Sequence, residues 1–209
     1  MITDFHQANY VKGWHNVASN KTTYICGDSF AASDNTSKIV PWHEQFECIN
    51  FARDCATNLN ISKQVDKAIQ FNAKFIIVLF TTCVRQDWKG TFYTFHNLEN
   101  NPANLSSEQV KLLKEYFVEF FELDLEIYRN KCIIESVLQR LVDSGIPFLF
   151  DQGGFEHPKF GTTKSYFEKY NQYRSKHCLW DYGDSKVMHP SFHIADQELQ
   201  NRIADYYNG

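Results

Sequence analysis

Runs of apolar residues, each followed by polar or turn-forming residues, predict four strands along the chain. The clearest is Ala73–Thr82 (AKFIIVLFTT), a continuous β-branched and aromatic run typical of a central strand buried on both faces. Shorter runs predict strands at Thr22–Cys26, Cys48–Ala52 and Pro147–Asp151.

Between these runs, apolar positions recur at the spacing of amphipathic helices. The predicted helices are Lys63–Asn72, Glu108–Asn130, Ile133–Ser144, a mixed-charge helix over 164–177, and Ala195–Tyr207. Ser106 or Ser107 is expected to cap the second helix, and Gly145 to end the third as a C′ glycine.

Strands that alternate with helices predict βαβ crossovers, and so an α/β fold with a mainly parallel sheet and helices on both faces. This arrangement is a three-layer α/β/α sandwich. No repeat or linker divides the chain, so we expect a short extension over 1–20 and a single domain over 21–209. In such sheets the active site lies beyond the carboxyl ends of the strands.

Charge and composition exclude some functions. The net charge of −4 and the pI near 6.0 argue against nucleic acid as the main partner, because phosphate binding needs a basic surface. The first twenty residues lack the apolar core of a signal peptide, and no segment reaches the roughly 18 apolar residues of a membrane span. The six cysteines form no C-x-x-C pair, which favours reduced, buried thiols. These features predict a cytoplasmic protein that binds neither membranes nor nucleic acid.

The loops after the predicted strands contain a possible nucleophile and a possible base. Ser29 follows the first strand in the turn Gly27-Asp28-Ser29, and His189 precedes the last helix. Serine needs a base within hydrogen-bond reach to act as a nucleophile, and histidine is the usual partner near neutral pH. Asp28 is expected to brace the turn rather than to transfer protons.

Three segments carry a resemblance to the SGNH/GDSL-type hydrolases, whose fold is related to flavodoxin-like sheets. They are ICGDSF (25–30), NFARDCATNLNI (50–61), and DSKVMHPS (184–191) with the helix QNRIADYY (200–207) after it. The resemblance spans nearly the whole chain, and ordered segments at both ends are more specific than a single Gly-Asp-Ser. It implies a serine esterase that needs no cofactor and no metal, and a small or carbohydrate-linked O-acyl ester as substrate.

The resemblance also implies roles for individual residues. Ser29 would be the nucleophile and His189 the base, oriented either by Asp184 or by a backbone carbonyl in a Ser-His dyad. The residues implied at the oxyanion or substrate are Cys55, Ala56, Asn58, Thr82 and Arg85. Arg85 has a second interpretation, an ion pair with Asp87 or Glu99.

The chain departs from the family pattern at three places. The third family motif, Gly-x-Asn-Asp, is replaced by Phe80-Thr81-Thr82-Cys83. Cys55 or Ala56 stands where the second motif has glycine. Asp184 precedes His189 by five residues, whereas the family spacing is three.

Two other functions compete with the esterase. A scaffold that has lost catalysis would explain the missing motif, because fold resemblance does not establish activity. A metal site would use His189 and His193 with His177 and Cys178, although Pro190 disfavours a helical turn between the first two histidines.

Overall fold

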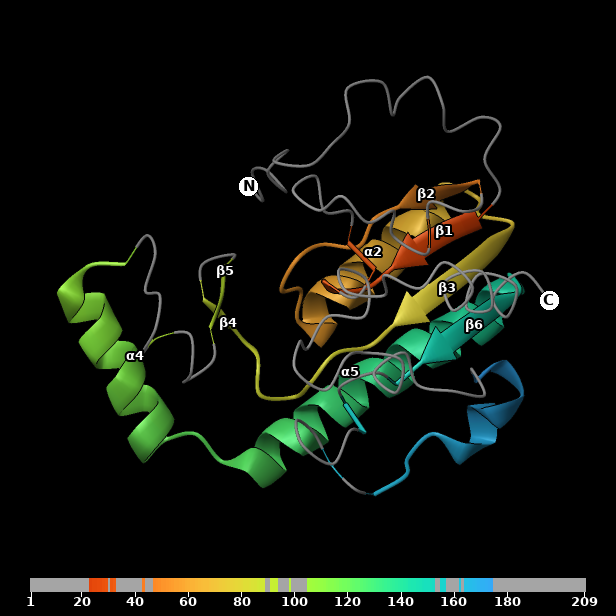
Figure 1. Ribbon diagram of the computed structural model, residues 1–209. Helices are drawn as coiled ribbons and strands as arrows, with labels where there is room; N and C mark the ends of the chain where they lie inside the picture. The colour runs from red at the N-terminus through yellow and green to blue at the C-terminus, as the bar shows by residue number, and fades with distance from the viewer. Residues whose placement is uncertain are drawn as a thin grey trace, which may run out of the picture.

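Four parallel strands form one sheet in the part of the chain that the structure describes. The computed structural model describes residues 23–29, 31, 32, 43, 47–88, 91–93, 98, 105–152, 155, 156, 162 and 164–174. The strands of the sheet are β1 (Thr23–Cys26), β2 (Cys48–Asn50), β3 (Phe75–Leu79) and β6 (Phe148–Asp151). Their order is β2-β1-β3-β6, and every neighbouring pair is parallel (Figure 1). The predicted α/β class with a parallel sheet is therefore confirmed.

The central strand β3 is buried on both of its faces. Ile76 and Val78 point into the main core cluster, while Ile77 and Leu79 alternate to the opposite face and are buried as well. A strand buried on both faces has no polar alternation. This is why the uninterrupted run FIIVL identified it correctly.

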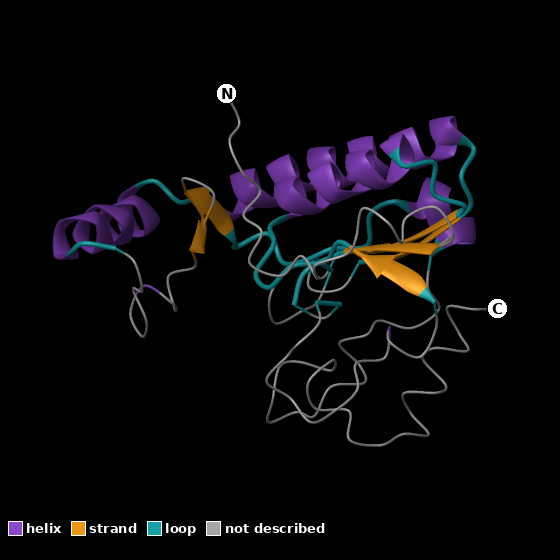
Figure 2. Ribbon diagram, turned by 90° about the horizontal axis from the view of Figure 1, so that it is seen from above, coloured by secondary structure: helices purple, strands orange, loops and turns teal. Residues whose placement is uncertain are grey.

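Two helices cover one face of the sheet. Helix α2 (Asn58–Gln70) and helix α5 (Leu123–Ser144) lie on the same side of the strands (Figure 2), and Arg140 of α5 bonds Ser62 and Asp66 of α2. Both helices contribute aliphatic side chains to the core cluster: Ile61, Val65, Ala68, Ile134, Val137, Leu138 and Leu141. Burial of these side chains away from water is the main force that holds the helices on the sheet.

A hairpin and one further helix lie to one side of the sheet. Strands β4 (Gln86–Trp88) and β5 (Thr91–Tyr93) pair antiparallel, and helix α4 (Ser107–Glu119) follows them (Figure 1). In α4, Leu113 packs with Leu98 in a small separate cluster. The sequence does not predict this hairpin, because three-residue strands show too little alternation.

The helix boundaries show where local signals succeed and where they fail. Ser106 caps α4 in a capping box with Gln109, and Gly145 ends α5 at φ 67°, both as predicted. Helix α2 begins five residues before its predicted start, because the Thr57 side chain caps it. The predicted helix Glu108–Asn130 is wrong: the chain leaves the helix at residues 120–122, and α5 then runs unbroken through the predicted second boundary.

The last described segment differs from its predicted mixed-charge helix. Over 164–174 the structure has only the 3-10 helix η2 (Glu168–Tyr173). Tyr170 and Tyr173 lie three residues apart, which a 3-10 helix places on one side; Tyr170 is buried and Tyr173 stacks on Phe148 at 4.3 Å. The predicted helix Ala195–Tyr207 lies outside the described residues.

The described cysteines are all free thiols: Cys26, Cys48, Cys55, Cys83 and Cys132. Cys132 is exposed on α5, which corrects the expectation that it is buried. Within the described residues, none of the helices has the length and apolar character needed to cross a membrane.

Candidate active site

The order of the strands brings two loops together at the carboxyl ends of the strands, which form one edge of the sheet. From β1 the chain crosses outward to β2, and then returns to place β3 on the other side of β1. The direction of winding therefore changes between β1 and β3, and open α/β sheets bind ligands at such a point, beyond the carboxyl ends of the strands. The segments there are Gly27–Ser29 after β1 and Thr81–Thr82 after β3.

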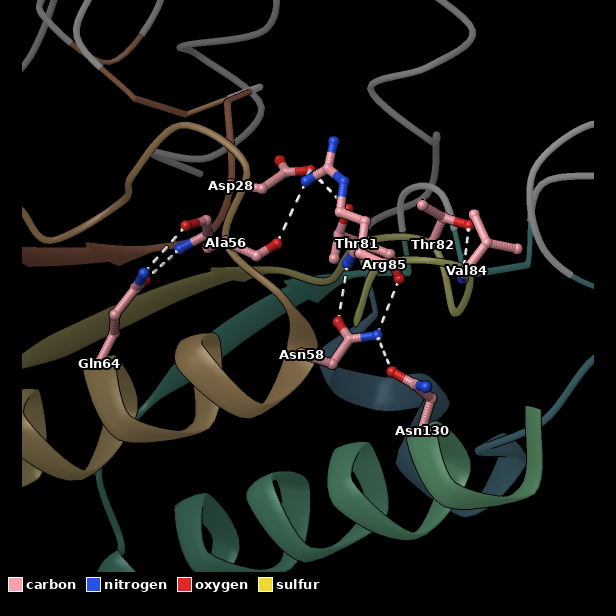
Figure 3. A network of polar contacts seen from close by, with 10 residues as sticks. Asp28, Ala56, Asn58, Gln64, Thr81, Thr82, Val84, Arg85 and Asn130 are labelled. Atoms are coloured by element: carbon pink, nitrogen blue, oxygen red, sulfur yellow. Dashed lines mark hydrogen bonds and ion pairs between the residues drawn. The ribbon is translucent and has the colours of Figure 1, made fainter. Parts of the chain in front are cut away.

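A buried ion pair braces this edge. Asp28 is 1% exposed, and its Oδ2 accepts hydrogen bonds from Arg85 Nη1 at 2.8 Å and from Thr81 Oγ1 at 2.6 Å (Figure 3). Arg85 Nη1 also donates to the Ala56 carbonyl at 3.1 Å. The contacts tie together the loops after β1, β2 and β3, which confirms that Asp28 braces its turn.

The ion pair corrects one part of the alternative interpretation of Arg85. The carboxylate partner that the structure shows is Asp28, which is 57 residues away in sequence, rather than Asp87; the other candidate, Glu99, lies outside the described residues. Asp87 instead accepts from Thr57 Oγ1 at 2.5 Å and from Asn60 Nδ2 at 2.8 Å, at the start of α2.

Two side-chain amides of α2 hold the ends of β1 and β3. Gln64 accepts from Gly27 N–H at 2.7 Å and donates to Gly27 C=O at 3.1 Å. Asn58 accepts from Thr81 N–H at 2.9 Å and donates to Thr81 C=O at 2.9 Å. The Asn58 amide thus takes the place of a neighbouring strand at Thr81, and the Gln64 amide adds to the backbone bonds of Gly27 (Figure 3). The Gly27 carbonyl also accepts from Arg53 N–H, after β2, at 3.1 Å.

Asn58 is therefore a bracing residue and not the oxyanion donor that the sequence suggested. Its Nδ2 has two hydrogens, which go to Thr81 O and, at 2.8 Å, to Asn130 Oδ1 on α5. Asn130 continues the network with a bond from its Nδ2 to Glu126 O at 2.9 Å. The site is thereby attached to both helices that cover the sheet.

We expect Asn58→Ala to lower the free energy of unfolding by about 2 kcal/mol, because it leaves the buried N–H and C=O of Thr81 without this partner. Urea denaturation measures the change. The matched control is Asn60→Ala, which removes an exposed bond to Asp87 on the same helix and is expected to change stability by less than about 0.5 kcal/mol. Equal losses in the two variants would contradict the bracing role.

Gly27 lies in a closely packed position. A Cβ built on Gly27 would lie 3.1 Å from Leu79 Cβ and 3.3 Å from the Leu79 carbonyl oxygen. An added Cβ would require Leu79 to move by a few tenths of an ångström at the edge where the site lies. The turn that carries Asp28 and Ser29 therefore starts from a closely packed position.

Cys55 occupies a backbone conformation that favours glycine. Its φ is 65°, in the left-handed region, so it fits the position that the second family motif gives to glycine. Burial raises the pKa of its thiol to about 11; Arg85 opposes this, and Asp54 and Asp28 add to it. The thiol is therefore protonated at neutral pH, and it lies within electrostatic reach of the ion pair.

Ser29 follows Asp28 in a turn whose backbone is held in place. The Asp28 carbonyl accepts from Ala31 N–H and Ala32 N–H, both at 3.0 Å. Ser29 is 2% exposed. Thr82, on the adjacent loop, is also buried, and its Oγ1 accepts from Val84 N–H at 3.4 Å.

The site candidates divide into three groups. The edge of the sheet carries Ser29, Cys55, Ala56, Thr82 and Arg85, on loops that the Asp28–Arg85 contacts connect. Asn58 lies beneath them in the helix. The catalytic candidates His189 and Asp184 lie outside the described residues, as do the metal candidates His177, Cys178 and His193. Within the described part, no group of three or more His, Cys, Asp or Glu side chains could hold a metal ion.

Two residues of the site were missed in the sequence analysis. Gln64 and Asn130 are buried amides on the core-facing sides of α2 and α5. A polar side chain among the apolar positions of a helix has to find a hydrogen-bond partner, which is the signal that could have identified both. The hydrogen-bond partners of the two amides, however, could not have been predicted from the spacing of apolar and polar residues.

No protein-family model and no curated protein matches this chain.

Proposed function

We propose that this protein is a serine hydrolase of the SGNH/GDSL type that cleaves or transfers an O-acyl ester, with Ser29 as its nucleophile. The observation that carries the proposal is the position of Ser29: it lies in a braced turn after β1, at the point where the winding of the sheet reverses. This is where the fold provides a ligand site.

The arrangement of the strands supports the proposed family. The order β2-β1-β3-β6 corresponds to the first four positions of the flavodoxin-like order 2-1-3-4-5. Cys55 in a glycine-like conformation, on the loop after β2, supports the match to the second motif. A three-layer sandwich, with helices also on the second face, is part of this proposal.

The proposed reaction has two steps. Ser29 Oγ attacks the acyl carbonyl carbon while His189 accepts the hydroxyl proton; the ester C–O bond then breaks and His189 protonates the departing alcohol. Water next attacks the carbonyl carbon of the acyl-serine and gives a proton to His189. The bond to Ser29 Oγ then breaks, His189 returns the proton to Ser29, and the carboxylic acid product leaves. The resemblance implies Asp184 as the carboxylate that orients the imidazole.

Backbone N–H groups are the proposed oxyanion donors. Ala56 N–H already donates to the Arg53 carbonyl at 3.3 Å, so Cys55 N–H is the better candidate on the loop after β2. Ser29 N–H is the second donor, and the hydroxyl of Thr82 takes the place of the missing asparagine amide. Arg85 braces these loops through Asp28 rather than binding the oxyanion.

One observation favours the alternative, a catalytically inactive scaffold. A nucleophile has to meet its substrate, and Ser29 is almost fully buried. A serine that only packs in the turn would have this exposure. Access to the hydroxyl therefore discriminates between the two functions.

A fluorophosphonate probe tests the proposal, because it reacts with an activated serine and forms a stable bond to its oxygen. We expect the wild type to be labelled and Ser29→Ala to lose the labelling completely while its circular dichroism and melting temperature stay close to the wild type. Mass spectrometry of the labelled peptide locates the modified residue. Ser107→Ala, an exposed serine at the start of α4, is the control and should be labelled like the wild type.

Wild-type protein that resists the probe over a wide range of pH would support the scaffold. Undiminished labelling of Ser29→Ala would instead show that the nucleophile is a different residue.

A further inference from the structure

Exposed apolar side chains are concentrated in one part of the described chain. Of the nine large apolar side chains that are exposed among the described residues, six lie between Leu112 and Tyr128, in α4 and the start of α5. Single exposed apolar residues are ordinary on a protein surface, whereas a concentration of them marks an interaction site. The start of α5, which extends past the sheet toward α4 (Figure 1), is therefore a candidate interaction surface.

The outward face of α5 begins with three exposed residues at helical spacing. Leu125, Tyr128 and Cys132 lie at positions i, i+3 and i+7, and Tyr128 is 63% exposed. We call these three residues the α5 stripe. The residues that α5 buries, which include Asn130 and Ile134, lie on the opposite side of the helix. Helices α2 and α5 form the outer layer on their side of the sheet (Figure 2), so the α5 stripe faces away from the core.

The spacing of the α5 stripe is that of a helix-pairing seam. In a heptad, Leu125 and Cys132 take the a position and Tyr128 takes the d position. The next d and a residues are Glu135 and Gln139, so the apolar seam ends after Cys132. Side chains at a and d fill the gaps of a facing helix, and the facing helix needs an equally short apolar seam.

The charges beside the α5 stripe match those of a second copy. Asp124 and Lys131 lie seven residues apart on one flank, and Glu122 and Arg129 lie seven residues apart on the other. When two copies run antiparallel, each flank faces the same flank of the other copy. Asp124 then faces Lys131, and Glu122 faces Arg129. A parallel pairing would bring together only Asp124 and Arg129, so the charges favour the antiparallel one.

The two basic residues keep donors for such contacts. Arg129 bonds Glu126 of its own chain at 2.6 Å, but its side chain is 55% exposed and a guanidinium has five N–H donors. The Lys131 ammonium lies 5.4 Å from the centre of the Tyr166 ring, a contact that occupies none of its donors with an acceptor oxygen.

We propose that the α5 stripe is the contact surface between two copies of this chain, paired antiparallel about a two-fold axis. Leu125 of each copy packs on Tyr128 of the other, and the same ion pairs form on both sides of the axis. A seam of about two turns buries less than the roughly 800 Å² per partner of a stable complex, so the dissociation constant should be on the order of 10 μM. The inference does not depend on the proposed function.

Sedimentation velocity of the full chain from about 1 to about 500 μM tests the proposal, because the expected dissociation constant lies within that range. We expect the wild type to change from monomer to dimer. Tyr128→Asp places a charge in the seam and should weaken the dimer at least about tenfold. Its melting temperature at the lowest concentration should stay close to the wild type, because Tyr128 is exposed in the monomer. Leu125→Ser is a milder second variant with the same expected direction. Val142→Asp, an exposed apolar position at the other end of α5, is the matched control and should leave the dimer unchanged.

A charge exchange tests the antiparallel arrangement. Asp124→Lys turns two attractive pairs of the dimer into repulsive ones, as does Lys131→Asp, and each should weaken the dimer at least about tenfold. The double variant Asp124→Lys/Lys131→Asp restores opposite charges and should recover the wild-type dissociation constant to within about threefold. Asp143→Lys makes the same charge change on α5 away from the stripe and should have no effect.

Each outcome decides a part of the proposal. A wild type that stays monomeric at every concentration overturns it and leaves the α5 stripe to a different partner. A dimer that neither Tyr128→Asp nor Leu125→Ser weakens overturns it as well, because another surface would hold the two copies together. A double charge variant that associates no better than the single variants overturns the antiparallel pairing.

Discussion

The variant Arg85→Met is expected to lose about 3 to 5 kcal/mol of its free energy of unfolding, because it removes the cation from a buried ion pair. Arg85 is 11% exposed, and Asp28 would remain buried without the cation that neutralises its charge, although it would keep the hydrogen bond from the Thr81 hydroxyl. Water does not screen the pair as it would at the surface. Urea denaturation measures the loss as a lower midpoint at an unchanged slope.

A double-mutant cycle identifies the source of that loss. Asp28→Asn added to Arg85→Met removes the uncompensated charge, so the double variant should be more stable than the sum of the two single losses predicts. Lys111→Met is the control for an exposed pair, since Lys111 lies 3.9 Å from Glu115 on the surface of α4. It should change stability by less than about 0.5 kcal/mol. A similarly small change in Arg85→Met would show that the ion pair does not stabilise this edge.

Acid should destabilise the protein through His43. This side chain is 1% exposed, and burial lowers its pKa from about 6.5 to about 4. Between these two values the unfolded chain binds a proton that the folded protein excludes, so stability is fully present above pH 6.5 and is lost as the pH falls toward 4. The contribution of this one residue amounts to about 2 to 3 kcal/mol near pH 4.5.

The variant His43→Gln isolates that contribution. It cannot take up the proton, whereas the carboxylates and the other histidines titrate alike in both proteins. We expect the loss of stability between pH 7 and pH 4.5 to be smaller in His43→Gln by about 2 to 3 kcal/mol, measured by urea denaturation at each pH. Parallel pH dependence in the two proteins would show that His43 takes up a proton equally easily in the folded and unfolded states.

Helix α2 links the fold to the candidate site. Asn58 and Gln64 lie about 1.7 turns apart on this helix, and each amide bonds the end of a different strand. The two strand ends are those beside the proposed nucleophile. A change in the core beneath α2 should therefore alter the geometry of the site as well as the stability of the protein.

Local sequence determined the elements whose signals need no distant partner. The β-branched run of β3 indicates burial on both faces, Ser106 and Gln109 form their capping box from within four residues, and Gly145 adopts the left-handed conformation that ends α5. The turn Gly27-Asp28-Ser29 after β1 was also predicted. These features depend on backbone preferences and on the spacing of neighbouring side chains, and the local sequence determines both.

Only the tertiary structure decided which distant residues meet. Asp28 bonds Arg85, which is 57 residues away in sequence, and Asn58 bonds Asn130, which is 72 residues away. The break between α4 and α5 was hidden as well, because apolar spacing continues through residues 120–122 without a glycine or proline to mark it. Polar partners and helix breaks of this kind depend on how the whole chain packs, and each buried polar group takes whichever partner the fold brings within hydrogen-bond reach.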